Sequence, residues 1–174
     1  VEDEIARLRQ AVEEVKAELI AARDEIASSV DAQLAQIFDG HLAMLADPEL
    51  IDRTEIQIRE TRRNAASVLS NVFELHAERI RSYNDPKIAS IANDVRDVSA
   101  RLLAHLSGTS AGAPIRPATK SIVIAHDLAP TQTAQMAREL VVGFATDIGG
   151  PVSHTALLAK ALDIPAVVGV GNIA

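Results

Sequence analysis

The sequence lacks cysteine, has very few aromatic residues and contains no long uninterrupted apolar run. Without cysteine, the chain has no disulfides, thiolate metal sites or cysteine nucleophiles. Aromatic residues make up 2% of the chain and hydrophobic residues 48%, so the core must be built from aliphatic side chains and alanine. That composition favours closely packed helices. Because no apolar run reaches the length of a bilayer crossing, we expect no membrane segment.

Basic residues are also in deficit, with 17 Lys and Arg against 24 Asp and Glu and a net charge of −7. No basic stripe is available to neutralise phosphates, which argues against nucleic-acid binding and favours a basic protein partner. The charged start, VEDEIARLRQ, is unlike a signal peptide. We therefore expect a cytoplasmic location, and the start within a helical pattern suggests a piece of a longer protein.

The first half of the sequence has the periodicity of a helical bundle. Apolar residues recur at spacings of four and three at Val1, Ile5, Leu8, Val12, Val15, Leu19, Ala22 and Ile26. The pattern continues loosely through Val30, Leu34 and Ile37. Taken alone, this seam is typical of a structural helical hairpin or a dimeric coiled coil. Asp47-Pro48 predicts the start of a second helix, with Asp47 as its N-cap.

Two further helices follow in the predicted bundle. The third runs from near Asn64 to Tyr83 with Val68, Leu69, Val72, Leu75 and Ile80 facing inward. Asp85-Pro86 opens the fourth, which ends near Gly108 and carries an apolar stripe of Ile88, Ile91, Val95, Val98, Leu102 and Leu106. Four helices with short joints predict a bundle over residues 1–108.

Residues 109–119 are rich in Ser, Gly, Ala and Pro and predict a linker. Strands at 121–125, 141–146 and 166–170 then alternate with helices from Pro130 through Arg138 and over 154–162. This alternation indicates an α/β layer over 120–174, too thin to be complete. The predicted fold class is α+β, a four-helix bundle joined to a partial α/β domain.

His154 is the main candidate for chemistry, because it lies at a predicted helix start after Gly149 and Gly150 and between Ser153 and Thr155. Unpaired N–H groups and a partial positive charge make helix starts suitable for anions. A neutral imidazole there can attack phosphorus and later leave. The simpler interpretation is a structural histidine. A metal site is disfavoured, because the helix has no second ligand at helical spacing before Asp163.

Four segments resemble sequences of the enzyme I family, the phosphoenolpyruvate–protein phosphotransferases. GGPVSHTALLAKALDIPAVVG resembles the phosphohistidine signature shared by enzyme I, pyruvate phosphate dikinase and phosphoenolpyruvate synthase, with Lys160 where an Arg is more usual. AHDLAPTQTAQM resembles the segment that precedes it in the family. QIFDGHLAMLADPEL and NDVRDVSARLLAHL resemble bundle segments of enzyme I that the dikinases lack.

The resemblance implies that His154 is the phosphorylated residue and that Thr133 supports it by hydrogen bonding, with Gly149, Gly150, Ser153 and Thr155 positioning the phosphate. The α/β part is then the swivelling phosphohistidine domain. The phosphoryl group originates from phosphoenolpyruvate and passes to a histidine of an HPr-like carrier. By the same resemblance, a C-terminal barrel outside this chain holds phosphoenolpyruvate and Mg²⁺ and makes the homodimer, and no metal binds to this fragment.

The resemblance also places carrier contacts in the bundle, at His41, Met44, Asp47, Glu49 and Arg101. Each of these residues also has an ordinary structural interpretation, as core, helix cap or surface residue. Gln33 and Gln36 stand where the family has acidic residues, which leaves open whether the carrier belongs to the sugar-transport or the nitrogen branch. His76, His105 and His126 are predicted to be structural or surface residues.

Two other functions are compatible with the sequence. The chain can be a helical interaction module without chemistry, as the seam over residues 1–26 suggests. Alternatively, the same phosphotransfer unit can belong to a dihydroxyacetone-kinase phosphoryl donor or follow a nitrogen-regulatory sensor domain.

Overall fold

The computed structural model describes residues 1–29, 32–83, 85–108, 115–137, 139–151 and 153–173. Val30 of the loose seam, most of the predicted linker and Arg138 lie outside these residues. The helix predicted from Pro130 through Arg138 ends earlier, at Ala134. None of the described helices combines the length and the apolar character that a bilayer crossing requires. The secondary structure is mainly helical with a small parallel sheet, which confirms the predicted α+β class.

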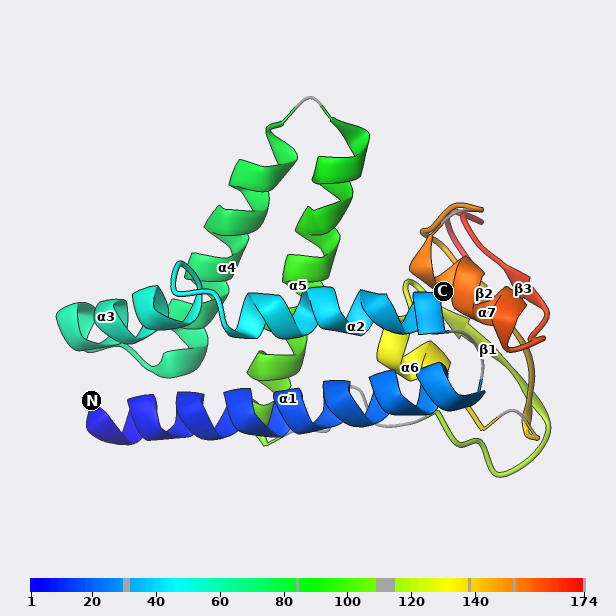
Figure 1. The fold of residues 1–174 in the computed structure, drawn as a ribbon, viewed down its shortest axis with the longest axis horizontal. Helices are drawn as coiled ribbons and strands as arrows, with labels where there is room; N and C mark the ends of the chain where they lie inside the picture. The colour runs from blue at the N-terminus through cyan, green and yellow to red at the C-terminus, as the bar shows by residue number, and fades with distance from the viewer. Residues whose placement is uncertain (30–31, 84, 109–114, 138, 152, 174) are drawn as a thin grey trace. The chain divides into compact units, whose positions relative to one another are not determined.

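Five helices occupy the first part of the described chain, one more than predicted. Their bounds are α1 Glu2–Ser29, α2 Ala32–Leu45, α3 Ile51–Thr61, α4 Ala65–Arg81 and α5 Pro86–Ser107 (Figure 1). The loose continuation of the first seam is a separate helix, α2. The seam residues from Ile5 to Ile26 are buried, whereas Val1, at the chain end, is 48% exposed.

Helices α4 and α5 pack side by side as an antiparallel hairpin (Figure 1). Helix α4 begins beside Asn64, as predicted, and Asn64 caps it, because its side chain accepts a hydrogen bond from the Ser67 amide. Gly108 follows α5 with a φ of +66°, which fits a C-terminal stop. Three residues predicted to face inward are exposed instead, and they are Leu75, Ile88 and Ile91.

The last part of the chain is a three-stranded parallel sheet with two helices. Strands β1 (Ser121–Ala125), β2 (Val141–Thr146) and β3 (Ala166–Val167) lie in that order, and α6 (Pro130–Ala134) and α7 (His154–Ala161) connect them. Strand β3 is shorter than predicted, and both of its residues are exposed. Because the strands are parallel, the segments that follow β1 and β2 emerge at one edge of the sheet.

The chain divides into two compact units. Val1–Ile20 and Asp39–Ala111 form a helical unit, and Ala21–Phe38 and Gly112–Ala174 form an α/β unit. This grouping gives residues 21–38 to the α/β unit, whereas the sequence placed 1–108 in one bundle. The apolar seam runs through position 20 without interruption, so the sequence pattern does not indicate a boundary between two units there.

Candidate functional site

His154 is the first residue of α7, and the residues around it form a capped helix start. The N-cap residue Ser153 is extended, with φ −66° and ψ 153°, and its Oγ accepts a hydrogen bond from the Ala156 amide at 3.3 Å. The helix forms because Thr155, Leu158, Ala159 and Leu162 recur on one buried face. The His154 side chain is half-buried, so part of it is accessible from solvent.

The first turn of α7 offers backbone donors beside the imidazole. The first amides of an α-helix have no acceptor within the helix, and Ser153 satisfies that of Ala156 only. These amides and the aligned peptide dipoles favour an anion at the helix start. A phosphoryl group on a His154 ring nitrogen would carry its negative oxygens into this environment.

Thr155 uses its side chain to hold the helix start in place. Its hydroxyl donates a hydrogen bond to the Leu128 carbonyl oxygen at 2.8 Å, and both residues are buried. This bond joins α7 to the segment just before α6, and the two helices pack against each other. The Thr155 hydroxyl is therefore engaged within the protein, while its backbone N–H belongs to the first turn of α7.

Thr133, the predicted partner of His154, is completely buried in α6. Its hydroxyl donates to the Ala129 carbonyl oxygen at 3.3 Å, a bond within its own helix. The oxygen can accept a further hydrogen bond, because a hydroxyl has two acceptor lone pairs. That Thr133 orients the imidazole stays a prediction.

The two glycines before the site differ in their structural demands. Gly149 has a φ of +113°, and a Cβ there would lie 3.3 Å from the Cβ of Val168. Gly169, with a φ of +76°, packs so closely that a Cβ would lie 2.8 Å from the Gly149 carbonyl oxygen. Gly150 lacks this left-handed conformation, and open space surrounds the position of its missing Cβ. Only Gly149 is thus required by the fold of the loop.

Asp147, which follows β2 at the edge of the sheet, has a structural role that the sequence analysis missed. It follows β2 and is buried, and its carboxylate accepts the Ile173 amide at 2.5 Å and lies 3.1 Å from Nδ1 of His126. His126 itself follows β1 and is exposed, as predicted. The parallel order of β1 and β2, once predicted, could have revealed this pair. Lys160 is exposed at the other end of α7, in its last turn.

The five predicted carrier contacts divide by burial. Glu49 is exposed, and Met44 and Asp47 are half-buried, with the Asp47 carboxylate accepting the Glu49 amide at 2.9 Å. His41 and Arg101 are 1% and 3% exposed, so neither offers a partner much surface. Burial lowers the pKa of the Arg101 guanidinium, whereas the negative charges of Asp97 and Glu18 act in the opposite direction and raise it.

A hollow of about 300 Å³ lies beside Glu49 in the helical unit. Its lining comes from the α2–α3 turn, α3 and α4: Glu49, Arg53, Val72, Leu75, His76 and Arg79. Leu75 is 55% exposed, and Glu49 lies 3.6 Å from Arg53. The hollow thus combines an exposed apolar side chain with charges of both signs, a composition that is suited to contact with another protein.

His105, predicted to be structural or at the surface, joins α5 to α1. Its Nδ1 lies 2.7 Å from a Glu14 carboxylate oxygen, and its Nε2 lies 2.9 Å from one of Glu18. A hydrogen bond from Gln10, followed by that from His105, lowers the pKa of Glu14. The two carboxylates occupy opposite edges of the ring, which is the arrangement of a structural bridge.

Comparisons with known proteins match both parts of the chain. The family model described as PEP-utilising enzyme, N-terminal, matches residues 1–90, and that of the PEP-utilising enzyme, mobile domain, matches residues 117–174. The phosphoenolpyruvate-protein phosphotransferase of Priestia megaterium is 39% identical over 99% of this chain. That of Enterococcus faecalis is 40% identical over 98%. The chain spans only 30% of the length of each relative.

Solved structures show the same fold. A solution structure of the Enzyme I protein nEIt has a TM-score of 0.76 and 38% identity, and the match covers 98% of this chain and 69% of that one. The N-terminal domain of Enzyme 1 - Nitrogen has a TM-score of 0.70 and 28% identity, covering 95% and 67%. The predicted resemblance is confirmed, and the chain belongs to the family of PEP-utilising enzymes, of which it spans N-terminal and mobile-domain sequence.

Proposed function

We propose that this chain is the phosphoryl-accepting and carrier-binding part of a phosphoenolpyruvate–protein phosphotransferase. In this function, His154 takes up a phosphoryl group and passes it to a histidine of an HPr-like carrier. The observation that carries the proposal is the placement of His154, half-buried at the capped start of α7 within the segment that matches the mobile domain.

The proposed transfer is a substitution at phosphorus. A ring nitrogen of His154 forms a P–N bond as the bond between phosphorus and the donor breaks. In the second step, a ring nitrogen of the carrier histidine forms a P–N bond as the bond from phosphorus to His154 breaks. The first-turn amides of α7 hold the phosphoryl oxygens, and Ser153 and Thr155 fix that turn. The Thr133 hydroxyl oxygen accepts an N–H of the imidazole, which leaves the other ring nitrogen with its lone pair.

We assign phosphoenolpyruvate, Mg²⁺ and the dimer contact to parts of the full-length protein outside this chain. Among the described residues, the only group of three metal-ligating side chains lies in the helical unit, and His154 is not a member. The α/β unit therefore supplies a histidine and backbone donors, and we expect the complete protein to work in the cytoplasm.

For the carrier, we propose a docking surface made of Met44, Asp47, Glu49 and Leu75. Glu49 and Leu75 line the same hollow, and Asp47 organises the turn that presents Glu49. The excess of acidic residues favours a carrier with a basic contact surface. The burial of His41 and Arg101 supports a role for these two residues in holding the helices rather than in contact.

The transfer is tested by mixing the chain with phosphorylated carrier from the sugar or the nitrogen branch and measuring acid-labile phosphate on the chain. We expect uptake by the wild type and by His126→Ala, which removes an exposed histidine of the same unit. His154→Ala should take up none, and uptake by that variant would refute the assignment. Tight binding of the carrier without any transfer would instead support an interaction module.

The docking surface is tested separately, by carrier affinity. Replacing Leu75 by Asp removes an apolar side chain and should weaken binding by about 10- to 100-fold, because burial of a leucine contributes about 1.5–3 kcal/mol. Ile20→Asp is the matched control, since Ile20 is exposed on α1 and does not line the hollow. Equal affinities of the two variants would contradict the proposed surface.

A further inference from the structure

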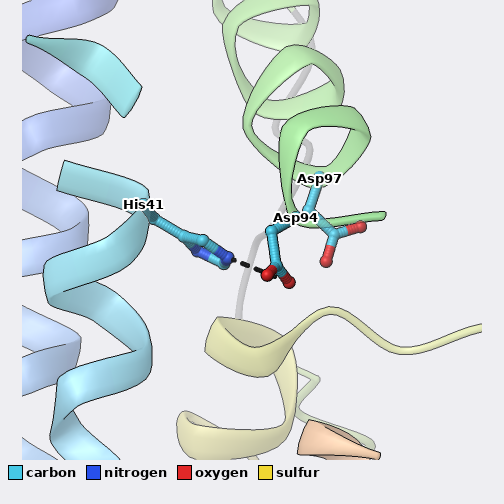
Figure 2. A group of neighbouring side chains, drawn as sticks. All are labelled: His41, Asp94 and Asp97. Atoms are coloured by element: carbon cyan, nitrogen blue, oxygen red, sulfur yellow. Dashed lines mark ion pairs between the residues drawn. The ribbon is translucent and has the colours of Figure 1, made fainter. Parts of the chain in front are cut away.

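Helices α2 and α5 bring an imidazole and two carboxylates together in the helical unit, whereas the residues proposed for phosphoryl transfer belong to the α/β unit. Figure 2 shows His41 extending from α2 toward Asp94 and Asp97 on α5. Nε2 of His41 lies 3.6 Å from Oδ1 of Asp94. One ligand atom from each of the three residues lies within 4.8 Å of the other two.

The 3.6 Å between Nε2 of His41 and Oδ1 of Asp94 is close to the separation expected of two ligands of one ion. It is longer than a good N–H···O hydrogen bond, which measures about 2.7–3.2 Å. Two ligands bound at about 2.1 Å to a tetrahedral ion lie about 3.4 Å from each other. To share an ion, the side chains of His41 and Asp94 need to approach each other slightly, and the carboxylate of Asp97 needs to move by at most about 1.4 Å. Rotation of the Asp97 side chain, which is partly exposed, supplies this movement.

The helices also place the three side chains suitably. Asp94 and Asp97 are three residues apart on α5 and so share one face of the helix. His41 opposes them with 1% of its side chain exposed, whereas that of Asp94 is 19% exposed. The imidazole is thus fixed in the interior, and the carboxylates leave a route by which an ion and water can enter.

Arg101 sets a limit on the strength of this site. It lies one turn beyond Asp97 on α5, it is buried, and the two charges interact. A bound cation must share Asp97 with this guanidinium, which favours His41 and Asp94 as the principal ligands and weakens the binding of the cation.

We propose that His41, Asp94 and Asp97 bind a divalent transition-metal ion, of which Zn²⁺ is the representative. Imidazole together with carboxylates suits this class, whereas Mg²⁺ prefers oxygen ligands alone. Three protein ligands leave a coordination position for water. The bound ion would join α2 to α5 and fix the segment that carries Met44, three residues beyond His41 and part of the proposed docking surface.

The test is a calorimetric titration of Zn²⁺ into the 174-residue chain at neutral pH, with Mg²⁺ as a comparison. We expect one Zn²⁺ per chain and no comparable binding of Mg²⁺. Asp94→Asn and Asp97→Asn keep the side-chain shape and should each weaken Zn²⁺ binding by about tenfold or more, since even residues behind the ligands cost 10- to 100-fold in such sites. These two variants decide the matter if His41→Gln fails to fold.

His105→Gln is the matched control. It removes an imidazole of the same unit that also lies between two carboxylates, but on opposite edges of the ring where they cannot share an ion. Wild-type Zn²⁺ affinity is expected for this variant and for His154→Ala, so the cation site and the phosphoryl site are tested independently. Undiminished binding by both Asp variants, or loss of binding in His105→Gln, would overturn the proposal.

Discussion

Replacing Thr155 by Val probes the connection between α7 and the segment before α6. Valine keeps the branched shape of threonine and removes only the hydroxyl, which donates a 2.8 Å hydrogen bond to the Leu128 carbonyl oxygen. Thr155 is 6% exposed and Leu128 is 3% exposed, so water does not readily replace the lost donor. Leaving the buried Leu128 carbonyl without a hydrogen-bond donor costs about 1–3 kcal/mol, and we expect the local stability of α7 to fall by this amount.

The measurement that suits this prediction is amide hydrogen exchange in α7. Global denaturation of a chain with two compact units need not be a single transition, whereas exchange reports the local opening free energy. A loss of about 1–3 kcal/mol speeds exchange by roughly 5- to 150-fold where exchange follows the opening equilibrium. Phosphoryl uptake by His154 should slow as well, because the imidazole is carried on the loosened turn.

Thr155→Ser is the control, since serine keeps the donor and loses one buried methyl group, worth about 0.8 kcal/mol. The reasoning predicts that serine is milder than valine both in exchange and in phosphoryl uptake. If Thr155→Val protects α7 as well as the wild type does, or if serine proves the more harmful change, the hydroxyl does not hold this helix.

Two other predictions concern the loop and the helical unit. Gly149→Ala should lower the local opening free energy of the α/β unit by about 1–3 kcal/mol because of the positive φ, whereas Gly150→Ala should stay within about 0.5 kcal/mol, as amide hydrogen exchange can check. Hydrogen bonds from Arg9, at 2.7 and 2.8 Å, lower the pKa of the Glu55 carboxyl below its unfolded value of about 4.3. The stability they confer is present above that value and lost as pH falls through the folded pKa, so Glu55→Gln should destabilise at neutral pH and the difference should shrink in acid.

The elements that the sequence predicts well are those whose signals are local. The start of α4 near Asn64 and the start of α7 at His154 occur where predicted, and each is capped by the side chain just before it. The cap predicted at Asp47 is wrong, because Leu50 precedes α3 and makes no side-chain cap hydrogen bond. Strands β1 and β2 match because short β-branched runs between turn residues have few other conformations. The end of α1 is different, because an apolar seam does not record where one helix stops and another continues.

Burial is where sequence reasoning fails in the helical unit. His41 and Arg101 are polar residue types that usually lie at the surface, yet both are buried, with Arg101 beside the charges of Asp97 and Glu18. Leu75 shows the reverse, since its stripe on α4 predicts a core position and the structure leaves it 55% exposed. Periodicity identifies an apolar face, but only tertiary packing decides how much of that face a neighbouring element covers.

Several side chains near His154 serve to hold the start of α7 and the preceding loop in place. The hydroxyls of Thr133 and Thr155 and the Oγ of Ser153 form hydrogen bonds within the protein, and the conformation of Gly149 serves the packing of its loop. In the proposed transfer, the phosphoryl group meets the half-buried imidazole of His154 and the backbone donors of the first turn of α7. Loss of a holding residue should therefore be reversible by any change that restores the turn, whereas loss of the imidazole should not.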